Sequence, residues 1–440
     1  ALEADQAPAG LAGTANDKDV IMLRRILDYL GRLIDLPGHL KQMRDARDDP
    51  TFPPGVIVKS ILAMFLCRLG SLNALEQTVA GRLWKKLLGM KLPSADALGR
   101  ASQTMEAQPI RDMQHDLYDR LKRIKALIPP DHGLMVAVVD GHETHATRHR
   151  CCDGCLERTV CTRDGEVTEY YHRIVHLNLV GRDRCFQLDA EPIRPGEDEV
   201  AAAKRLVDRV LEKYPRAFDL VAGDGLYARS DFFNYLREKG KHALAVLKDE
   251  NRDLLKDARG LWEPAAPLVR EVGKIHYQVW DHEGYTSWPQ CAHPVRVVRS
   301  IETTTVRRQL PKQKARREKQ TPEPQTEPEV KTSEWVWVTT LPAAAAPTLA
   351  VVKIGHSRWS IENESFNELV NRWDGDHVYK HDPQSILIFW LLLSLSLNLF
   401  VAFYQRNLKP AIQKLYDTLA IARQILTDLC ATLPIQPRAP

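Results

Sequence analysis

The chain has 440 residues, of which 44% are hydrophobic and 27% are charged, and this balance excludes a wholly disordered chain, a collagen-like chain and a multi-span membrane protein. Its length exceeds the size at which one hydrophobic core usually stops growing, so we expect two or three domains. The formal net charge is only +4, so any binding of nucleic acid has to come from local basic patches.

The amino-terminal region is predicted to be helical. The chain does not start with a basic segment and an apolar stretch, so we expect a cytoplasmic protein, associated with the nucleoid if DNA is its partner. Apolar residues recur at helical spacing from about residue 18 to residue 128, which predicts a helical domain over residues 1–130. A group of basic residues makes it a candidate DNA-binding domain. Four basic residues near one bend fit either contacts with DNA phosphates or a solvated helix face: Arg82, Lys85, Lys86 and Lys91.

The pattern changes at Leu134, where LMVAVVDG is typical of a short strand buried on both faces. The segments EYYHRIVHLNLVG, RCFQLDAEPI, FDLVAGDGLY and HALAVLKDE predict further strands, and VAAAKRLVDRVLEKY and SDFFNYLREKG predict helices between them. We therefore expect an α/β domain over residues 131–405, with a mixed sheet flanked by helices.

A β-rich insertion is expected in this domain at about residues 265–342, because several runs there alternate apolar and polar residues. Residues 311–333 are first basic and then rich in Pro and Glu, which predicts a mobile loop. Helices return after the insertion, and a helical tail is expected over residues 406–440.

The run ILIFWLLLSLSLNLFVAFY is long enough to cross a bilayer. Three polar residues interrupt it, Ser394, Ser396 and Asn398, and no second run of this kind exists. A helix packed on all sides inside a protein is also apolar all round. We favour this interpretation and expect no membrane partner.

Three acids follow or lie within predicted elements of the α/β domain. Asp140 ends the strand VAVVD, Asp224 follows the strand LVAG, and Glu362 lies one helical turn after Arg358. Taken singly, an Asp after a strand is more often a turn former or a helix cap. Taken together, three carboxylates suit two divalent cations roughly 3.5–4 Å apart, which clamp the attacking and leaving oxygens of a phosphoryl transfer.

Three pieces of the sequence resemble, in the same order, the DDE transposases of bacterial insertion sequences. They are VVDGHETHA, then AGDGLYARSDFF with AVLKDE, then WVTTLP with HSRWSIENESFNEL. The most specific piece, Arg358-Trp359-x-Ile361-Glu362, is similar to the signature of the group with Tyr, Arg, Glu and Lys around the third carboxylate. The resemblance implies an RNase H-like fold, metal-dependent DNA cleavage and strand transfer, Mg²⁺ (or Mn²⁺) as two ions, and a homodimer on transposon ends and target DNA.

The resemblance assigns Asp140, Asp224 and Glu362 as the catalytic acids and metal ligands. Glu364 is a rival third acid, but it would point about 200° around an α-helix from Glu362. The residues predicted to contact DNA are Arg358, Lys248, Arg372 and Tyr227.

Two positions depart from the signature of that group. The tyrosine position holds Gly355 and the lysine position holds Leu369. The phosphate contacts of those two residues therefore fall to neighbours, with His356, Asn371 and Arg372 as the candidates.

The Cys/His segment 142–176 holds half of a zinc-ribbon spacing, Cys152-x-x-Cys155. A structural Zn²⁺ would take its other ligands from His149, Cys151, Cys161 and His172, and reduced thiols on a loop are the alternative. Similar transposases often carry a Cys-x-x-Cys after the first aspartate.

Two other functions remain open at this point. One is a transposase remnant that binds DNA without cutting it. The other is a zinc metallohydrolase built on His142, His145 and His149, although HETH lacks the H-E-x-x-H spacing that places two histidines on one helix face.

Overall fold

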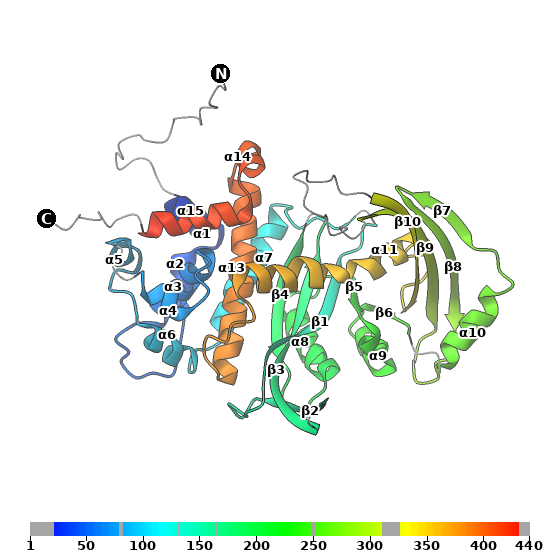
Figure 1. Ribbon diagram of the computed structural model, residues 1–440, viewed down its shortest axis with the longest axis horizontal. Helices are drawn as coiled ribbons and strands as arrows, with labels where there is room; N and C mark the ends of the chain where they lie inside the picture. Colours follow the sequence, from blue (N-terminus) through cyan, green and yellow to red (C-terminus); the bar gives the residue numbers. More distant parts are fainter. Residues whose placement is uncertain are drawn as a thin grey trace, which may run out of the picture. The chain divides into compact units, whose positions relative to one another are not determined.

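The computed structural model describes residues 22–78, 82–130, 132–163, 165–182, 184–248, 252–309 and 326–430 (Figure 1). The chain divides into two compact units. The first unit contains the residues up to Ile124, Cys151–Asp153 and the residues from Leu369 onward, and the second contains residues 125–150 and 154–368. The domain limits expected from the sequence, at residues 130 and 405, remain predictions.

The first unit is helical, as expected for the amino-terminal region. Ser94 begins α6 as its cap, because its hydroxyl accepts the backbone N–H of Ala97 at 3.3 Å. The helices are α1 (Met22–Ile34), α2 (Leu36–Gln42), α3 (Pro54–Leu66), α4 (Leu72–Glu76), α5 (Arg82–Leu88), α6 (Ala95–Ser102), α7 (Gln108–Arg123), α13 (Pro383–Asn407), α14 (Pro410–Leu415) and α15 (Thr418–Cys430).

Helix α13 forms the centre of this unit. It is the one helix of the described residues that is long and apolar enough to cross a membrane, yet 89% of its most apolar stretch is buried inside the protein. Helices α1, α3, α6 and α7 pack against it. The hydroxyl of Ser396 donates to the carbonyl of Leu392 at 2.7 Å, so this polar group is satisfied within the helix. The burial is typical of a core helix.

The second unit is built on a mixed sheet, so the expected α/β class is confirmed. Its strand order in the described residues is β2-β3-β1-β5-β6-β10-β9-β8-β7, and β4 pairs with β3 outside this row. Among the paired neighbours of the described strands, only β1 with β5 and β5 with β6 are parallel. The strands are β1 (Val136–Thr147), β2 (Leu156–Thr162), β3 (Gly165–Val180), β4 (Cys185–Pro192), β5 (Leu220–Gly223), β6 (His242–Val246), β7 (Leu268–Val272), β8 (Ile275–Tyr285), β9 (Val295–Gln309) and β10 (Thr326–Thr339).

Helices pack against this sheet. Helix α8 lies against β3 and β4, α9 against β6, and α11 against β6 and β9, while η2 contacts β1 and β4. Their bounds are α8 (Glu199–Lys213), η1 (Gly225–Tyr227), α9 (Ser230–Glu238), α10 (Asp253–Trp262), α11 (Thr348–Ser357) and η2 (Ile361–Phe366), and α12 (Asn367–Trp373) spans the point where the two units divide.

The two faces of β1 carry different neighbours. Val136 and Val138 share a buried core with Val351 of α11 and Ile361 of η2. Asp140 lies two residues beyond Val138, and side chains of a strand alternate between faces, so Asp140 projects toward the η2 side. The next residue along the strand projects toward the other side, where α8 packs.

The β-rich insertion is formed by β7 to β10, as expected. One part of the prediction is wrong: residues 326–333 were expected in a mobile loop, but they form the start of β10 and pair with β9. Polar and proline-rich composition does not prevent this pairing, because the ladder bonds join backbone groups. Residues 311–325 of the predicted loop lie outside the described residues.

Candidate active site

Asp140 is the first of the three acids predicted from the sequence, and its side chain is 14% exposed. One carboxylate oxygen accepts the backbone N–H of Gly141 at 2.9 Å, and the other lies 3.4 Å from the Arg358 guanidinium. The pKa of Asp140 is raised to about 7, chiefly by burial and also by the nearby Asp224 and Glu199, while Arg358 lowers it. The carboxylate therefore lies in an excess of negative charge.

Asp224 directly follows β5, which pairs in parallel with β1 as far as Val138. It caps the short helix η1, because its side chain accepts the backbone N–H of Leu226 at 2.8 Å. Asp224 therefore has the role of a helix cap, which was the alternative considered from the sequence. Its charge nevertheless raises the pKa of Asp140, which indicates that the two carboxylates are neighbours.

Glu362 lies in η2, a π-helical segment that follows α11. Arg358 donates to Glu362 at 2.7 Å and to Asp140 at 3.4 Å, so one buried guanidinium contacts both acids. π-Helical segments are rare and frequently occur at functional sites. The three carboxylates do not all approach within 4.8 Å of one another, and the guanidinium lies between Asp140 and Glu362.

The rival acid Glu364 points elsewhere. Its carboxylate accepts the backbone N–H of Cys185, at the start of β4, at 3.2 Å. Glu362, by contrast, shares Arg358 with Asp140. Glu362 and Glu364 thus contact different residues although they are only two positions apart.

This set of residues suits hard divalent cations. Carboxylate oxygens are the preferred ligands of Mg²⁺, and a bound cation would relieve the repulsion that raises the pKa of Asp140. Asp140 and Asp224 come from adjacent strands, and Glu362 comes from a helical segment that contacts β1. Three separate elements thus contribute the acids: β1, the turn after β5, and η2. The prediction that Asp140 ends its strand is wrong, because β1 pairs with β3 and continues to Thr147.

A basic cavity lies beside Asp224. It has a volume of about 360 Å³, and its lining includes Asp224, Lys248 and Arg252. Lys248 is exposed, and its side-chain stem lies near Gly225. Lys248, predicted to contact DNA, thus lines the same cavity as Asp224.

The other predicted DNA contacts differ in their surroundings. Tyr227 is fully buried and its hydroxyl donates to Glu199 at 2.9 Å, so we assign no DNA contact to it. Arg358 is 9% exposed and contacts the acids described above. Arg372 belongs to the first unit, where it donates to Thr418 at 3.3 Å.

The departures from the transposase signature have a steric explanation. A Cβ atom at position 355 would lie 2.3 Å from the indole of Trp337, which is itself buried. A tyrosine therefore does not fit at Gly355. Nε2 of His356 donates to Glu302 at 2.7 Å, and Leu369 is fully buried.

Glu199, the first residue of α8, lies near these acids and was not predicted from the sequence as a site residue. It is 7% exposed, binds Tyr227 and Arg173, and raises the pKa of Asp140. An acid at the first position of an amphipathic helix is ordinary, because it complements the helix dipole. The sequence therefore gave no signal that this acid lies near the other two.

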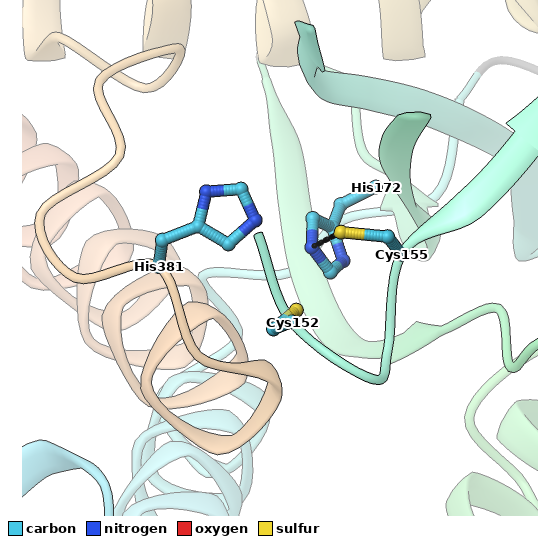
Figure 2. Close-up of side chains that lie close together, drawn as sticks. All are labelled: Cys152, Cys155, His172 and His381. Atoms are coloured by element: carbon cyan, nitrogen blue, oxygen red, sulfur yellow. Dashed lines mark hydrogen bonds between the residues drawn. The ribbon is translucent and has the colours of Figure 1, made fainter. Parts of the chain in front are cut away.

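The predicted zinc ligands separate into two groups. Cys155 and His172 are both buried, and their Sγ and Nε2 atoms lie 3.5 Å apart (Figure 2). Cys161 is exposed on β2, where Leu156 pairs beside His172, and five residues of strand from Leu156 span about 17 Å. His149 is exposed as well. Only Cys155 and His172 of these four are adjacent.

The three histidines of the metallohydrolase hypothesis do not assemble. The ring of His142 stacks on Phe366 at a centroid distance of 4.8 Å. In the described part of the chain, His142, His145 and His149 do not come together as a set of metal ligands. This arrangement gives the hypothesis no support.

Comparison with known proteins provides one match. Residues 195–399 match the family model of the transposase DDE domain. No curated protein matches the chain. The matched region contains Asp224, Arg358 and Glu362, and it agrees with the RNase H-like fold expected for the mixed sheet.

Proposed function

We propose that this chain, which matches the transposase DDE domain over residues 195–399, is a DDE transposase that cuts DNA at the ends of an insertion sequence and joins them to target DNA. Asp140, Asp224 and Glu362 are the proposed ligands of two Mg²⁺ or Mn²⁺ ions. The observation that supports this most is the contact of one buried arginine, Arg358, with both Asp140 and Glu362, beside a second aspartate that raises the pKa of the first.

The bound cations would supply Lewis-acid activation of the attacking and leaving oxygens of the DNA phosphate. The chain supplies positioning. Arg358 keeps Asp140 and Glu362 on either side of one guanidinium, so that both acids face the same space. Lys248, exposed beside Asp224, is the proposed contact for the phosphate next to the cleaved bond.

Cleavage of DNA that carries the flanking ends of the element tests this proposal. We expect Asp140→Asn, Asp224→Asn and Glu362→Gln each to abolish cleavage in Mg²⁺ or Mn²⁺ while DNA binding persists. Glu364→Gln is the matched control and should leave cleavage largely intact. Cleavage that survives Asp140→Asn contradicts the proposal, and a parent that binds the ends without cutting them identifies a remnant.

We also propose a structural Zn²⁺ on the Cys/His segment, with Cys155, His172 and, from the Cys-x-x-Cys spacing, Cys152 as ligands. The zinc content of the purified chain, measured by mass spectrometry, should fall from one ion in Cys155→Ser and His172→Gln. Cys161→Ser and His149→Gln serve as controls and should retain the ion. A parent without zinc contradicts this proposal and leaves the catalytic one untouched.

The proposed partner is double-stranded DNA, bound by a homodimer that holds two transposon ends. Because the net charge is small, binding should depend on local phosphate contacts and should weaken steeply as salt rises. Sedimentation of the chain with and without DNA of the element ends distinguishes a dimer formed on DNA from one formed alone.

A further inference from the structure

Glu199 lies behind the proposed catalytic acids, on the α8 side of the sheet. Its carboxylate accepts the hydroxyl of Tyr227 at Oε1, at 2.9 Å, and pairs through Oε2 with Nε of Arg173 at 2.8 Å. Both oxygens are therefore engaged by groups of the chain, and the side chain is 7% exposed. A carboxylate in these surroundings is poorly placed to bind a cation.

The backbone does not by itself fix the separation of Asp140 and Asp224. The parallel ladder between β1 and β5 ends at the pair Val138 and Ala222, two residues before each aspartate. Beyond that pair the two chain segments diverge, because Asp140 continues along β1 and Asp224 enters η1. Side chains therefore have to fix the distance between the segments that carry Asp140 and Asp224.

Two glycines show which side chains do so. A Cβ atom on Gly141 would lie 2.4 Å from Oε2 of Glu199, and a Cβ atom on Gly223 would lie 2.6 Å from the ring of Tyr227. The residue after Asp140 thus packs directly on Glu199, and the residue before Asp224 packs directly on Tyr227. The hydrogen bond between Glu199 and Tyr227 closes the connection.

We propose that Glu199, Tyr227 and Arg173 form a clamp that fixes the separation of Asp140 and Asp224, with Glu199 as a positioning residue and not a metal ligand. Arg173 neutralises the buried carboxylate and donates to the carbonyl of Gly141 at 3.2 Å, which ties β3 to the same point. This inference rests on the proposed function, because the clamp acts on the geometry of the cation ligands.

The first test is the affinity of the full-length chain for Mn²⁺ without DNA, measured by electron paramagnetic resonance. Tyr227→Phe removes only the hydroxyl and should weaken Mn²⁺ binding about tenfold, as loss of outer-shell partners commonly does. Tyr235→Phe is the matched control, because its hydroxyl bonds Lys204 and Asp208 away from the acids. It should bind Mn²⁺ as the parent does.

Substitutions of Glu199 separate positioning from packing. Glu199→Gln can still accept the Tyr227 hydroxyl but loses the ion pair, so we expect a smaller loss of affinity than in Glu199→Ala. In the cleavage assay, Tyr227→Phe should need more Mn²⁺ for half-maximal rate while the rate at saturating Mn²⁺ stays near that of the parent. A purely structural role would instead lower folding yield without this split.

The outcomes distinguish the clamp from the proposed function. If Tyr227→Phe binds Mn²⁺ as tightly as the parent does, while Asp140→Asn binds it more weakly, the clamp proposal is wrong. This variant decides the question even if Glu199→Ala fails to fold. If Asp140→Asn binds Mn²⁺ as tightly as the parent, the proposed cation site is wrong, and the clamp falls with it.

Discussion

Gly355 stands where the related signature carries a tyrosine, and its neighbour explains the difference. The indole of Trp337 occupies the space that a side chain at this position would need. Trp337 is 1% exposed and belongs to the core between β6, β10 and α11. A side chain added at Gly355 would therefore disturb the packing of α11 on the core.

We predict that Gly355→Ala lowers the free energy of unfolding by about 1–3 kcal/mol, because the added methyl group forces the core apart. Gly260→Ala in α10 is the matched control: nothing lies within 4 Å of its Cβ position. It should raise stability by roughly 0.5–1 kcal/mol through helix propensity. Urea unfolding measures both, and equal effects of the two variants would contradict the steric explanation.

His176 illustrates how burial makes a residue sensitive to pH. It is fully buried on β3, and its ring packs edge-on against Phe366. The pKa of His176 is lowered to about 3, chiefly by burial and also by the neighbouring His142. The folded chain therefore holds this imidazole neutral under conditions in which the unfolded chain protonates it.

The sign of the pH effect follows from this pKa. Between about pH 6.5 and pH 3 the unfolded chain binds the extra proton, so the contribution of His176 to stability is complete above pH 6.5 and is lost as the pH falls. We predict that His176→Asn loses less stability than the parent when the pH is lowered from 7 to 4.5. Parallel curves of melting temperature against pH for the two proteins would refute this.

At the scale of elements, α13 shows how an apolar run is used inside a protein. Leu392 and Leu399 are fully buried, and even Ser396 and Asn398 are covered. Four helices of the first unit pack around α13, so its apolar surface is satisfied by protein on all sides. The membrane alternative considered from the sequence therefore lacks support from this helix.

We predict that Leu392→Ala lowers the free energy of unfolding of the first unit by about 2–5 kcal/mol, because it leaves a cavity in this core. Leu415→Ala is the matched control, since Leu415 in α14 is 76% exposed, and its effect should stay within about 0.5 kcal/mol. Circular dichroism during urea unfolding provides the measurement. A similar small effect for both leucines would indicate that α13 is not packed as described.

At the scale of the whole molecule, the first unit is assembled from both ends of the chain. The amino-terminal helices α1 to α7 belong to the same unit as α13 to α15, and the sheet of the second unit lies between them in the sequence. The core of the first unit is consequently incomplete until the residues after Leu369 are present.

We predict that removal of residues 369–430 unfolds the amino-terminal helices as well, because α3 loses the helix on which it packs. The helical signal in circular dichroism should fall by more than the deleted helices account for. Co-expression of the missing segment as a separate chain should restore part of it. A loss equal to the deleted helices alone would show that residues 22–124 fold independently.

The sequence alone determined the class of the fold, the order of its elements and the candidates for the catalytic acids. Hydrophobic periodicity and an aspartate after an apolar run are local signals, so they can be recognised in the sequence without knowledge of the fold. Asp140, Asp224 and Glu362 were therefore named from their positions after strands and within a helical segment, with the family resemblance joining them. Their roles remain predictions until the variants are measured.

Only the tertiary structure decided which groups surround these acids. Glu199 enters from α8, which is distant in sequence from β1, Tyr227 turns inward instead of toward DNA, and Trp337 excludes a side chain at Gly355. The tertiary structure also decided that residues 326–333 form a strand, because their backbone groups pair with β9. Contacts between residues far apart in the chain leave no local pattern, and a sequence without its fold does not reveal them.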